Sequence, residues 1–128
     1  MAVSIVQLGT PRRADEGLRI GTVRRPPRGV KKSDFARKNY YDIWYPNLSP
    51  SAELVKQALG AKDEGDINAF RKKFRAEMAH PDRSRELDLL AALSHHSNFA
   101  VGCYCEDETR CHRFVLRELL KERGAKLV

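Results

Sequence analysis

The sequence of 128 residues predicts one α/β domain spanning 1–128, with a small, mainly parallel sheet of three to four strands flanked by four or so helices. Two observations carry this prediction. Short apolar segments rich in strand-forming residues stand near both ends of the chain, and segments with apolar residues at helical spacing separate or follow them. Strands that alternate with helices are typical of parallel sheets. The length suits one hydrophobic core.

Three segments are predicted to be strands. Val3–Leu8 is apolar and is stopped by Gly9, Thr10 and Pro11, and the alternation in Leu18–Val23 predicts a second strand. Asn98–Cys105 has the composition of a buried strand. The aromatic segment Tyr40–Tyr45 is compatible with an extended stretch or a short helical turn.

Four segments are predicted to be helices. Ser49 is expected to cap the first helix, with Pro50 in the first helical position. Asp66 is expected to cap the second helix, and the third should begin near Ser84. The last helix is predicted from about Thr109 to Arg123, with acidic residues at its N-terminal end, where the helix dipole favours them.

Composition places the chain among folded proteins of a reducing compartment. Apolar residues make up 41% and charged residues 32%, a balance that argues against general disorder. Three cysteines are too few for a disulfide scaffold, which predicts a cytoplasmic protein. No apolar run approaches the roughly 18 residues that a membrane span requires, so no membrane association is expected.

The positive charge is concentrated in one region, 12–38. This basic loop region holds ten basic and three acidic residues, so it accounts for the entire net charge of +7. Such a local field attracts phosphates, nucleic acid or acidic metabolites. It is equally compatible with a solvated loop that only keeps the protein soluble.

Two segments are expected to meet at the carboxyl edge of the sheet, where ligands bind in parallel α/β folds. One is the loop Arg24–Gly29, whose two prolines stiffen the backbone. The other runs from Cys103 through the first turn of the last helix, where free N–H groups favour an anion or a thiolate. Together they predict a pocket for a phosphate or a carboxylate.

The side chains of this predicted pocket suggest specific roles. Three arginines would hold the anion: Arg24, Arg28 and Arg113. His112 is the candidate acid or base, because the ordinary pKa of an imidazole lies near neutrality. Cys103 or Cys111 would be the nucleophile, if the protein uses one.

The cysteines admit three interpretations. Cys103, Cys105, Cys111 and His112 have ligand types that suit zinc, but their spacing is unlike that of the common zinc fingers. Neighbours on a helix also point about 100° apart, so we expect no metal and no cofactor. A reactive thiol would resemble a phosphatase loop, except that Cys111 stands where such a loop has arginine. Free cysteines are most often small buried hydrophobes.

Three blocks of sequence resemble the YeaO-like branch of the bacterial domain-of-unknown-function family 488. These are the loop Arg24–Val30, the segment Asp42–Leu54, and the pattern in which Cys103-Tyr104 precedes Cys111-His112-Arg113. The resemblance implies an α/β fold and marks the recurring polar residues Arg24, Arg28, Cys103, Cys111, His112 and Arg113. It implies no particular activity.

The chain departs from the family pattern at three positions. Val23 replaces the acid before the first loop arginine, Pro26 replaces the loop tryptophan, and Cys105 stands where an acid is common. Any role of those family residues is therefore in doubt for this chain.

Two classes of function follow, and the sequence leaves open whether the protein is an enzyme. The first is binding of a phosphate-bearing or other anionic ligand, with processing of that ligand as an option. The alternative is a non-catalytic accessory protein that binds DNA or RNA through the basic loop region 12–38. A pure interaction module is a third hypothesis, and Tyr40–Tyr45 could line a homodimer contact or a ligand cleft.

Overall fold

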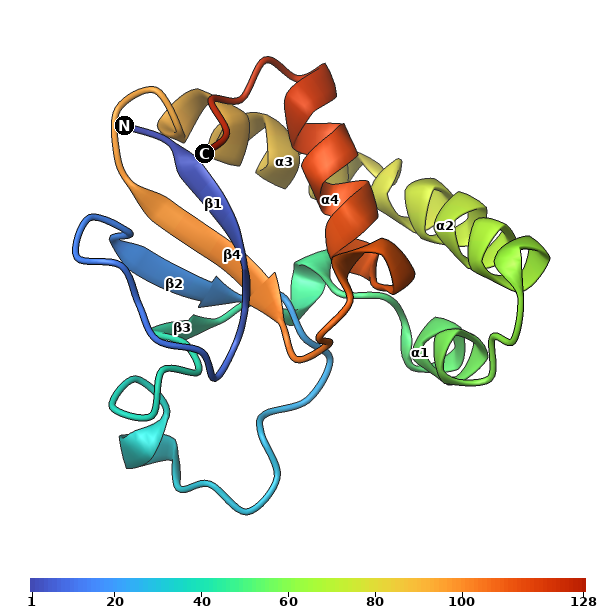
Figure 1. Cartoon of the computed structure of the whole chain (residues 1–128). Helices are drawn as coiled ribbons and strands as arrows, with labels where there is room; N and C mark the ends of the chain where they lie inside the picture. The colour runs from blue at the N-terminus through green and yellow to red at the C-terminus, as the bar shows by residue number, and fades with distance from the viewer.

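A computed structural model describes residues 1–128 (Figure 1). Its sheet has four strands in the order β1-β4-β2-β3, and every neighbouring pair is parallel. The strands are β1 (Val3–Gln7), β2 (Leu18–Gly21), β3 (Ile43–Trp44) and β4 (Phe99–Cys103). The predicted α/β class and parallel sheet are confirmed, and Tyr40–Tyr45 supplies the short edge strand β3.

Strand β4 occupies the interior of the sheet and depends on a glycine. Its partners are β1, where Val3 pairs with Phe99, and β2. At Gly102 a Cβ atom would lie 2.5 Å from the carbonyl oxygen of Val6, so the two backbones approach too closely for any side chain.

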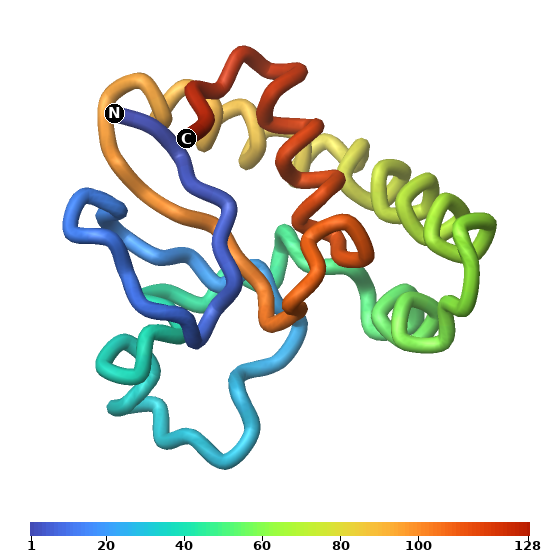
Figure 2. The backbone as a smooth tube through the Cα atoms, in the orientation of Figure 1, coloured from blue at the N-terminus to red at the C-terminus, as the bar shows by residue number.

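Four α-helices follow the predicted pattern: α1 (Ala52–Leu59), α2 (Glu64–Met78), α3 (Pro81–Leu93) and α4 (His112–Glu122). Short 3₁₀ turns lie between some of the elements, at Lys32–Asp34, Pro46–Leu48 and Glu108–Arg110. The tube in Figure 2 shows both chain ends at the same side of the molecule. The backbone N–H of Val3 donates to the carbonyl of Lys126 there, at 2.9 Å.

Three predicted helix starts were wrong by a few residues. Ser51, not Ser49, caps α1, because its hydroxyl accepts from the backbone N–H of Leu54. Asp63 caps α2 by accepting from the N–H of Asp66. Helix α3 starts at Pro81 rather than near Ser84, since the missing N–H of proline is no loss at a first helical position.

The start of the last helix also differs from the prediction. Instead of a continuous helix from Thr109, a 3₁₀ turn at Glu108–Arg110 precedes Cys111, which has extended backbone angles. Helix α4 then begins at His112. The extended conformation of Cys111 between the 3₁₀ turn and α4 determines how the side chains of Cys111 and His112 are placed.

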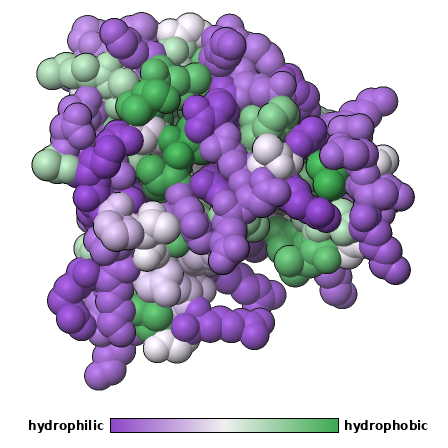
Figure 3. Space-filling model, in the orientation of Figure 1, coloured by the Kyte–Doolittle hydropathy of each residue, from purple (hydrophilic) through white to green (hydrophobic).

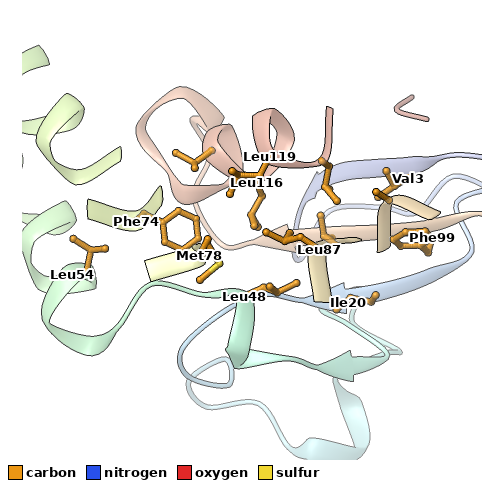
Figure 4. Close-up of a cluster of buried hydrophobic side chains, with 14 of the residues drawn as sticks. Val3, Ile20, Leu48, Leu54, Phe74, Met78, Leu87, Phe99, Leu116 and Leu119 are labelled. Carbon is orange, nitrogen blue, oxygen red and sulfur yellow. The ribbon is translucent and has the colours of Figure 1, made fainter. Parts of the chain in front are cut away.

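One hydrophobic core joins the helices to one face of the sheet (Figure 4). It combines Val3, Ile20 and Phe99 from three strands with side chains from all four helices. Members of the core that are labelled in the close-up include Leu48, Leu54, Phe74, Met78, Leu87, Leu116 and Leu119.

A buried ion pair lies on a different part of the sheet. Arg19 and Glu16 are both almost fully buried and form a two-point contact at 2.9 and 3.0 Å. Arg19 also donates to the carbonyls of Thr10 and Asn39. These bonds satisfy the guanidinium and hold two connecting loops against the sheet.

The surface in Figure 3 is mostly hydrophilic, with scattered apolar patches. No helix is both long and apolar enough to cross a membrane. The aromatic segment divides: Tyr41 is buried, whereas Ile43 and Trp44 are exposed on edge strand β3. The homodimer contact stays a prediction.

Candidate functional site

A cleft of about 1180 Å³ lies at the carboxyl edge of the sheet, beside the ends of β2 and β4. Its walls come from the loop after β2, from helix α1, and from the segment that joins β4 to α4. The hydroxyl of Tyr104 donates to the carbonyl of Arg25 at 2.8 Å and ties the first and last of these walls together. In Figure 2 the light-blue connection after β2 passes close to the orange segment after β4.

Cationic side chains carry nearly all of the charge in the walls of this cleft. Five of them line it: Arg24, Arg25, Arg28, Lys56 and Arg110. Glu53 is the only carboxylate among the lining residues. None of the five cations takes part in an ion pair, although most other arginines of the chain do. The cleft therefore carries uncompensated positive charge.

Arg24 and Arg28 differ in how firmly they are held. Arg24 donates from Nε to the carbonyl of Pro50 at 2.9 Å and from Nη2 to that of Ser49 at 3.2 Å. It therefore joins the loop to the segment that leads into α1. Arg28 is exposed and makes no hydrogen bond within the protein, so its guanidinium is free to meet a ligand.

Arg113 lies apart from the other two arginines of the predicted anion site. Its side chain is buried, it is not among the residues that line the cleft, and it donates to the backbone carbonyl of Cys105. The structure therefore places Arg113 beneath the segment between β4 and α4, where it holds that segment in position. Its Nε atom is buried without a partner.

The structure brings Cys103, Cys111 and His112 together at the cleft. One ligand atom from each lies within 4.8 Å of the others, and the Sγ of Cys111 is 3.4 Å from the Nδ1 of His112. All three residues are buried and line the cleft. We call this set the thiol–imidazole cluster.

The expectation that the side chains of Cys111 and His112 point too far apart to share one metal ion is wrong. It assumed that Cys111 and His112 are helical neighbours, but Cys111 has φ −127° and ψ 160° and only flanks the helix. An extended residue before a helical one directs its side chain differently from a helical neighbour. The two side chains therefore meet.

His112 is neutral in this environment. Burial, the largest influence, lowers the pKa of its imidazole to about 4. The Nε2 atom lies 2.6 Å from the backbone carbonyl of Thr22, which can only accept, so Nε2 carries the proton. The lone pair of Nδ1 then faces Cys111. This arrangement suits a hydrogen-bond acceptor or a metal ligand better than a proton donor at neutral pH.

Cys105 also lines the cleft, although the sequence favoured Cys103 or Cys111 as the candidate nucleophile. It is the one exposed cysteine. The neighbouring thiols of Cys103 and Cys111 can donate hydrogen bonds to its thiolate, and this lowers the pKa of Cys105 to about 2. The same contact, with burial, raises the pKa of Cys103. The predicted strand Asn98–Cys105 included Cys105 among its residues, whereas β4 ends at Cys103 and leaves Cys105 in the exposed segment that follows.

The fold and the site define a small parallel α/β protein whose cationic cleft and thiol–imidazole cluster share one edge of the sheet. A family model described as "Active DUF488-N3 subclade" matches residues 3–124. The chain therefore belongs to the DUF488 family, which confirms the resemblance seen in the sequence.

A relative from Escherichia coli (strain K12) is described as "Uncharacterized protein YeaO". It is 29% identical over 121 residues, an alignment that covers 94% of this chain and 98% of the relative. The alignment therefore covers nearly the whole chain. No solved structure matches this chain significantly.

Proposed function

We propose that this protein binds a phosphate-bearing small molecule, or another small anion, in the cleft at the carboxyl edge of the sheet. The observation that carries the proposal is the set of five cationic side chains without an ion-pair partner around one cleft. A cluster of like charges is unfavourable unless solvent or a ligand of opposite charge compensates it.

The cleft has the dimensions and the lining of a small-molecule site. Its volume of about 1180 Å³ accommodates a drug-sized or nucleotide-sized ligand. Apolar side chains, among them Leu8, Val55 and Phe70, line it together with the cations. Such a mixture favours a ligand with an anionic group and an apolar or planar part.

The arginines would take different roles. Arg24 is fixed by two backbone carbonyls, so it presents a preorganised charge, whereas Arg28 is unbound and would close onto the ligand. Guanidinium groups bind phosphate oxygens in a two-point geometry. A ligand held there lies next to the thiol–imidazole cluster, which supplies the groups that could act on it.

The alternative, nucleic-acid binding through the basic loop region 12–38, has less support from the charges. Four of its basic residues, Arg12, Arg13, Arg19 and Arg37, are paired with carboxylates. Lys31, Lys32 and Lys38 are exposed and unpaired. The other three unpaired basic residues of the region, Arg24, Arg25 and Arg28, line the cleft, where Lys56 and Arg110 add to their charge.

The test is calorimetric titration with inorganic phosphate, pyrophosphate, a mononucleotide and a short DNA duplex. We expect saturable binding of at least one of the small anions. Arg28→Ala should weaken it about tenfold, because a charge-assisted hydrogen bond contributes about 1.5–3 kcal/mol. Arg85→Ala is the matched control, since Arg85 is an exposed arginine on α3 outside the cleft.

Two outcomes would contradict the proposal. Equal losses in Arg28→Ala and Arg85→Ala would mean that general charge, and not this cleft, binds the anion. Binding of the duplex alone, with an affinity that falls steeply with salt, would favour the nucleic-acid alternative.

A further inference from the structure

We propose that Cys103, Cys111 and His112 form a binding site for one Zn²⁺ ion, with a fourth coordination position that opens to the cleft. This inference does not depend on the anion that the cleft binds. Two sulfurs and an imidazole nitrogen are ligand types that favour zinc over Mg²⁺ and Ca²⁺, which prefer oxygen.

The distances fit tetrahedral coordination. Ligands at about 2.3 Å for sulfur and 2.0 Å for nitrogen, separated by a tetrahedral angle, lie about 3.5 Å apart. The Sγ of Cys111 and the Nδ1 of His112 are 3.4 Å apart, and all three ligand atoms fall within 4.8 Å of one another. Only small side-chain adjustments separate this cluster from a zinc site.

Two backbone elements, the end of β4 and the start of α4, hold the ligands in place. Cys103 ends β4, and its carbonyl accepts from the N–H of Leu8 at 2.7 Å. Cys111 has an extended conformation directly before α4, so its side chain meets that of His112. The ligands come from the end of a strand and the start of a helix that pack in the same core. Their backbone is therefore already ordered, and ion binding costs little conformational entropy.

The imidazole is already oriented as a metal ligand. Its Nε2–H is committed to the carbonyl of Thr22 at 2.6 Å, which leaves Nδ1 unprotonated and directed at Cys111. Histidine ligands in proteins generally donate their second N–H to a carbonyl or a carboxylate in this way. The edge of the ring packs against Phe74, with the ring centroids 5.4 Å apart.

The cluster has one protein ligand fewer than the four of a structural zinc centre. Three protein ligands belong to the cluster, and all of them also line the cleft. Three protein ligands with an accessible fourth position distinguish catalytic from structural zinc sites. Cys105 lies nearby but does not belong to the group of atoms within 4.8 Å of one another. We therefore assign the fourth position to water or to the bound ligand.

The direct experiment uses the full chain, purified under reducing conditions and stripped with a chelator. Titration with Co²⁺ should give a sulfur-to-cobalt charge-transfer band that saturates at one equivalent, with the intensity of two thiolates. Zn²⁺ should then abolish this band by displacing Co²⁺. A chain that shows no such band and retains no Zn²⁺ after dialysis would overturn the proposal.

Substitution of each proposed ligand tests whether that residue coordinates the Zn²⁺ ion. Cys103→Ser, Cys111→Ser and His112→Asn should each weaken Zn²⁺ binding at least about tenfold, since even the loss of an outer-shell partner costs that much. His96→Asn, at an exposed position outside the cleft, is the matched control and should bind like the unaltered chain, and Cys105→Ser should retain the ion. If Cys105→Ser loses the ion as completely as Cys103→Ser, the open three-ligand site is wrong.

A last pair of measurements separates this inference from the proposed function. Circular dichroism of each metal-free variant distinguishes loss of a ligand from loss of the fold, and the Co²⁺ band of the unaltered chain tests the site without any variant. Arg28→Ala should bind one equivalent of Co²⁺ as the unaltered chain does, whether or not it binds phosphate. A weaker Co²⁺ band in this variant would contradict the independence of the two sites.

Discussion

The imidazole of His112 donates a hydrogen bond from Nε2 to the backbone carbonyl of Thr22, at 2.6 Å and across 90 positions of sequence. This bond joins the start of α4 to the residue after β2. Thr22 is itself held by Gly102, whose carbonyl accepts from both the backbone N–H and the hydroxyl of Thr22. The loop Arg24–Gly29, which follows Thr22, and the thiol–imidazole cluster are therefore both held in position by the hydrogen bonds of Thr22.

Replacing His112 by alanine should destabilise the fold by about 2–4 kcal/mol. The change opens a cavity beside Phe74 and leaves the buried carbonyl of Thr22 without its donor. Urea unfolding of the metal-free protein measures the loss. His96→Ala, at an exposed position, should stay within about 0.5 kcal/mol of the unaltered chain. Equal stability of the two variants would mean that the Thr22 bond contributes little.

Gly102→Ala should destabilise the sheet and disturb the site. The added Cβ would lie 2.5 Å from the carbonyl oxygen of Val6, so β4 and β1 must separate, at a cost of about 1–3 kcal/mol. Gly60→Ala is the control, because a Cβ there would be 3.7 Å from the nearest atom, which is ordinary contact. Thermal unfolding of both variants tests this. A Gly102→Ala protein as stable as Gly60→Ala would contradict the tight packing.

Glu108 should make stability depend on pH below its ordinary pKa of 4.5. Hydrogen bonds from Arg117, at 2.7 and 2.9 Å, lower the pKa of Glu108 in the folded protein. The unfolded chain therefore binds a proton first as the pH falls, so the stabilisation is complete above 4.5 and is lost as the pH drops through the lowered folded pKa.

The comparison that isolates this effect is Glu108→Gln against Glu106→Gln. The free energy of unfolding of Glu108→Gln should change less between pH 6 and pH 3 than that of the unaltered chain, whereas Glu106→Gln, exposed and unpaired, should follow the unaltered chain. Identical pH profiles for all three proteins would show that the Arg117 contact does not contribute. The two pH limits bracket, by about 1.5 units on either side, the ordinary pKa of a glutamate.

Cys105 should be the first cysteine that an alkylating reagent modifies. It is exposed, while Cys103 and Cys111 are only 1% and 4% exposed. Iodoacetamide labelling followed by peptide mass spectrometry should find the modification at Cys105 well before the other two. In Cys105→Ser, labelling should be slow until the protein is unfolded. Faster modification of Cys111 would mean that the start of α4 opens in solution.

Much of the fold was determined by local patterns. Apolar alternation placed β1, β2 and β4, and helical spacing placed α1 to α4, because these patterns report which face of an element is buried. The stiff Arg24–Gly29 loop was identifiable from its prolines, and its position followed from the rule for parallel sheets. The starts of α1 to α3 were less well determined, because several neighbouring residues could serve as caps.

What the sequence alone determined is therefore the parallel α/β class, the cationic loop and the presence of cysteines beside it. Only the tertiary structure decided that Arg113 turns inward to the carbonyl of Cys105, and that Cys111 is extended so that its thiol meets His112. The reason is physical. Both outcomes depend on hydrogen bonds and packing between segments far apart in the chain, such as the His112–Thr22 bond, and no local periodicity records such contacts.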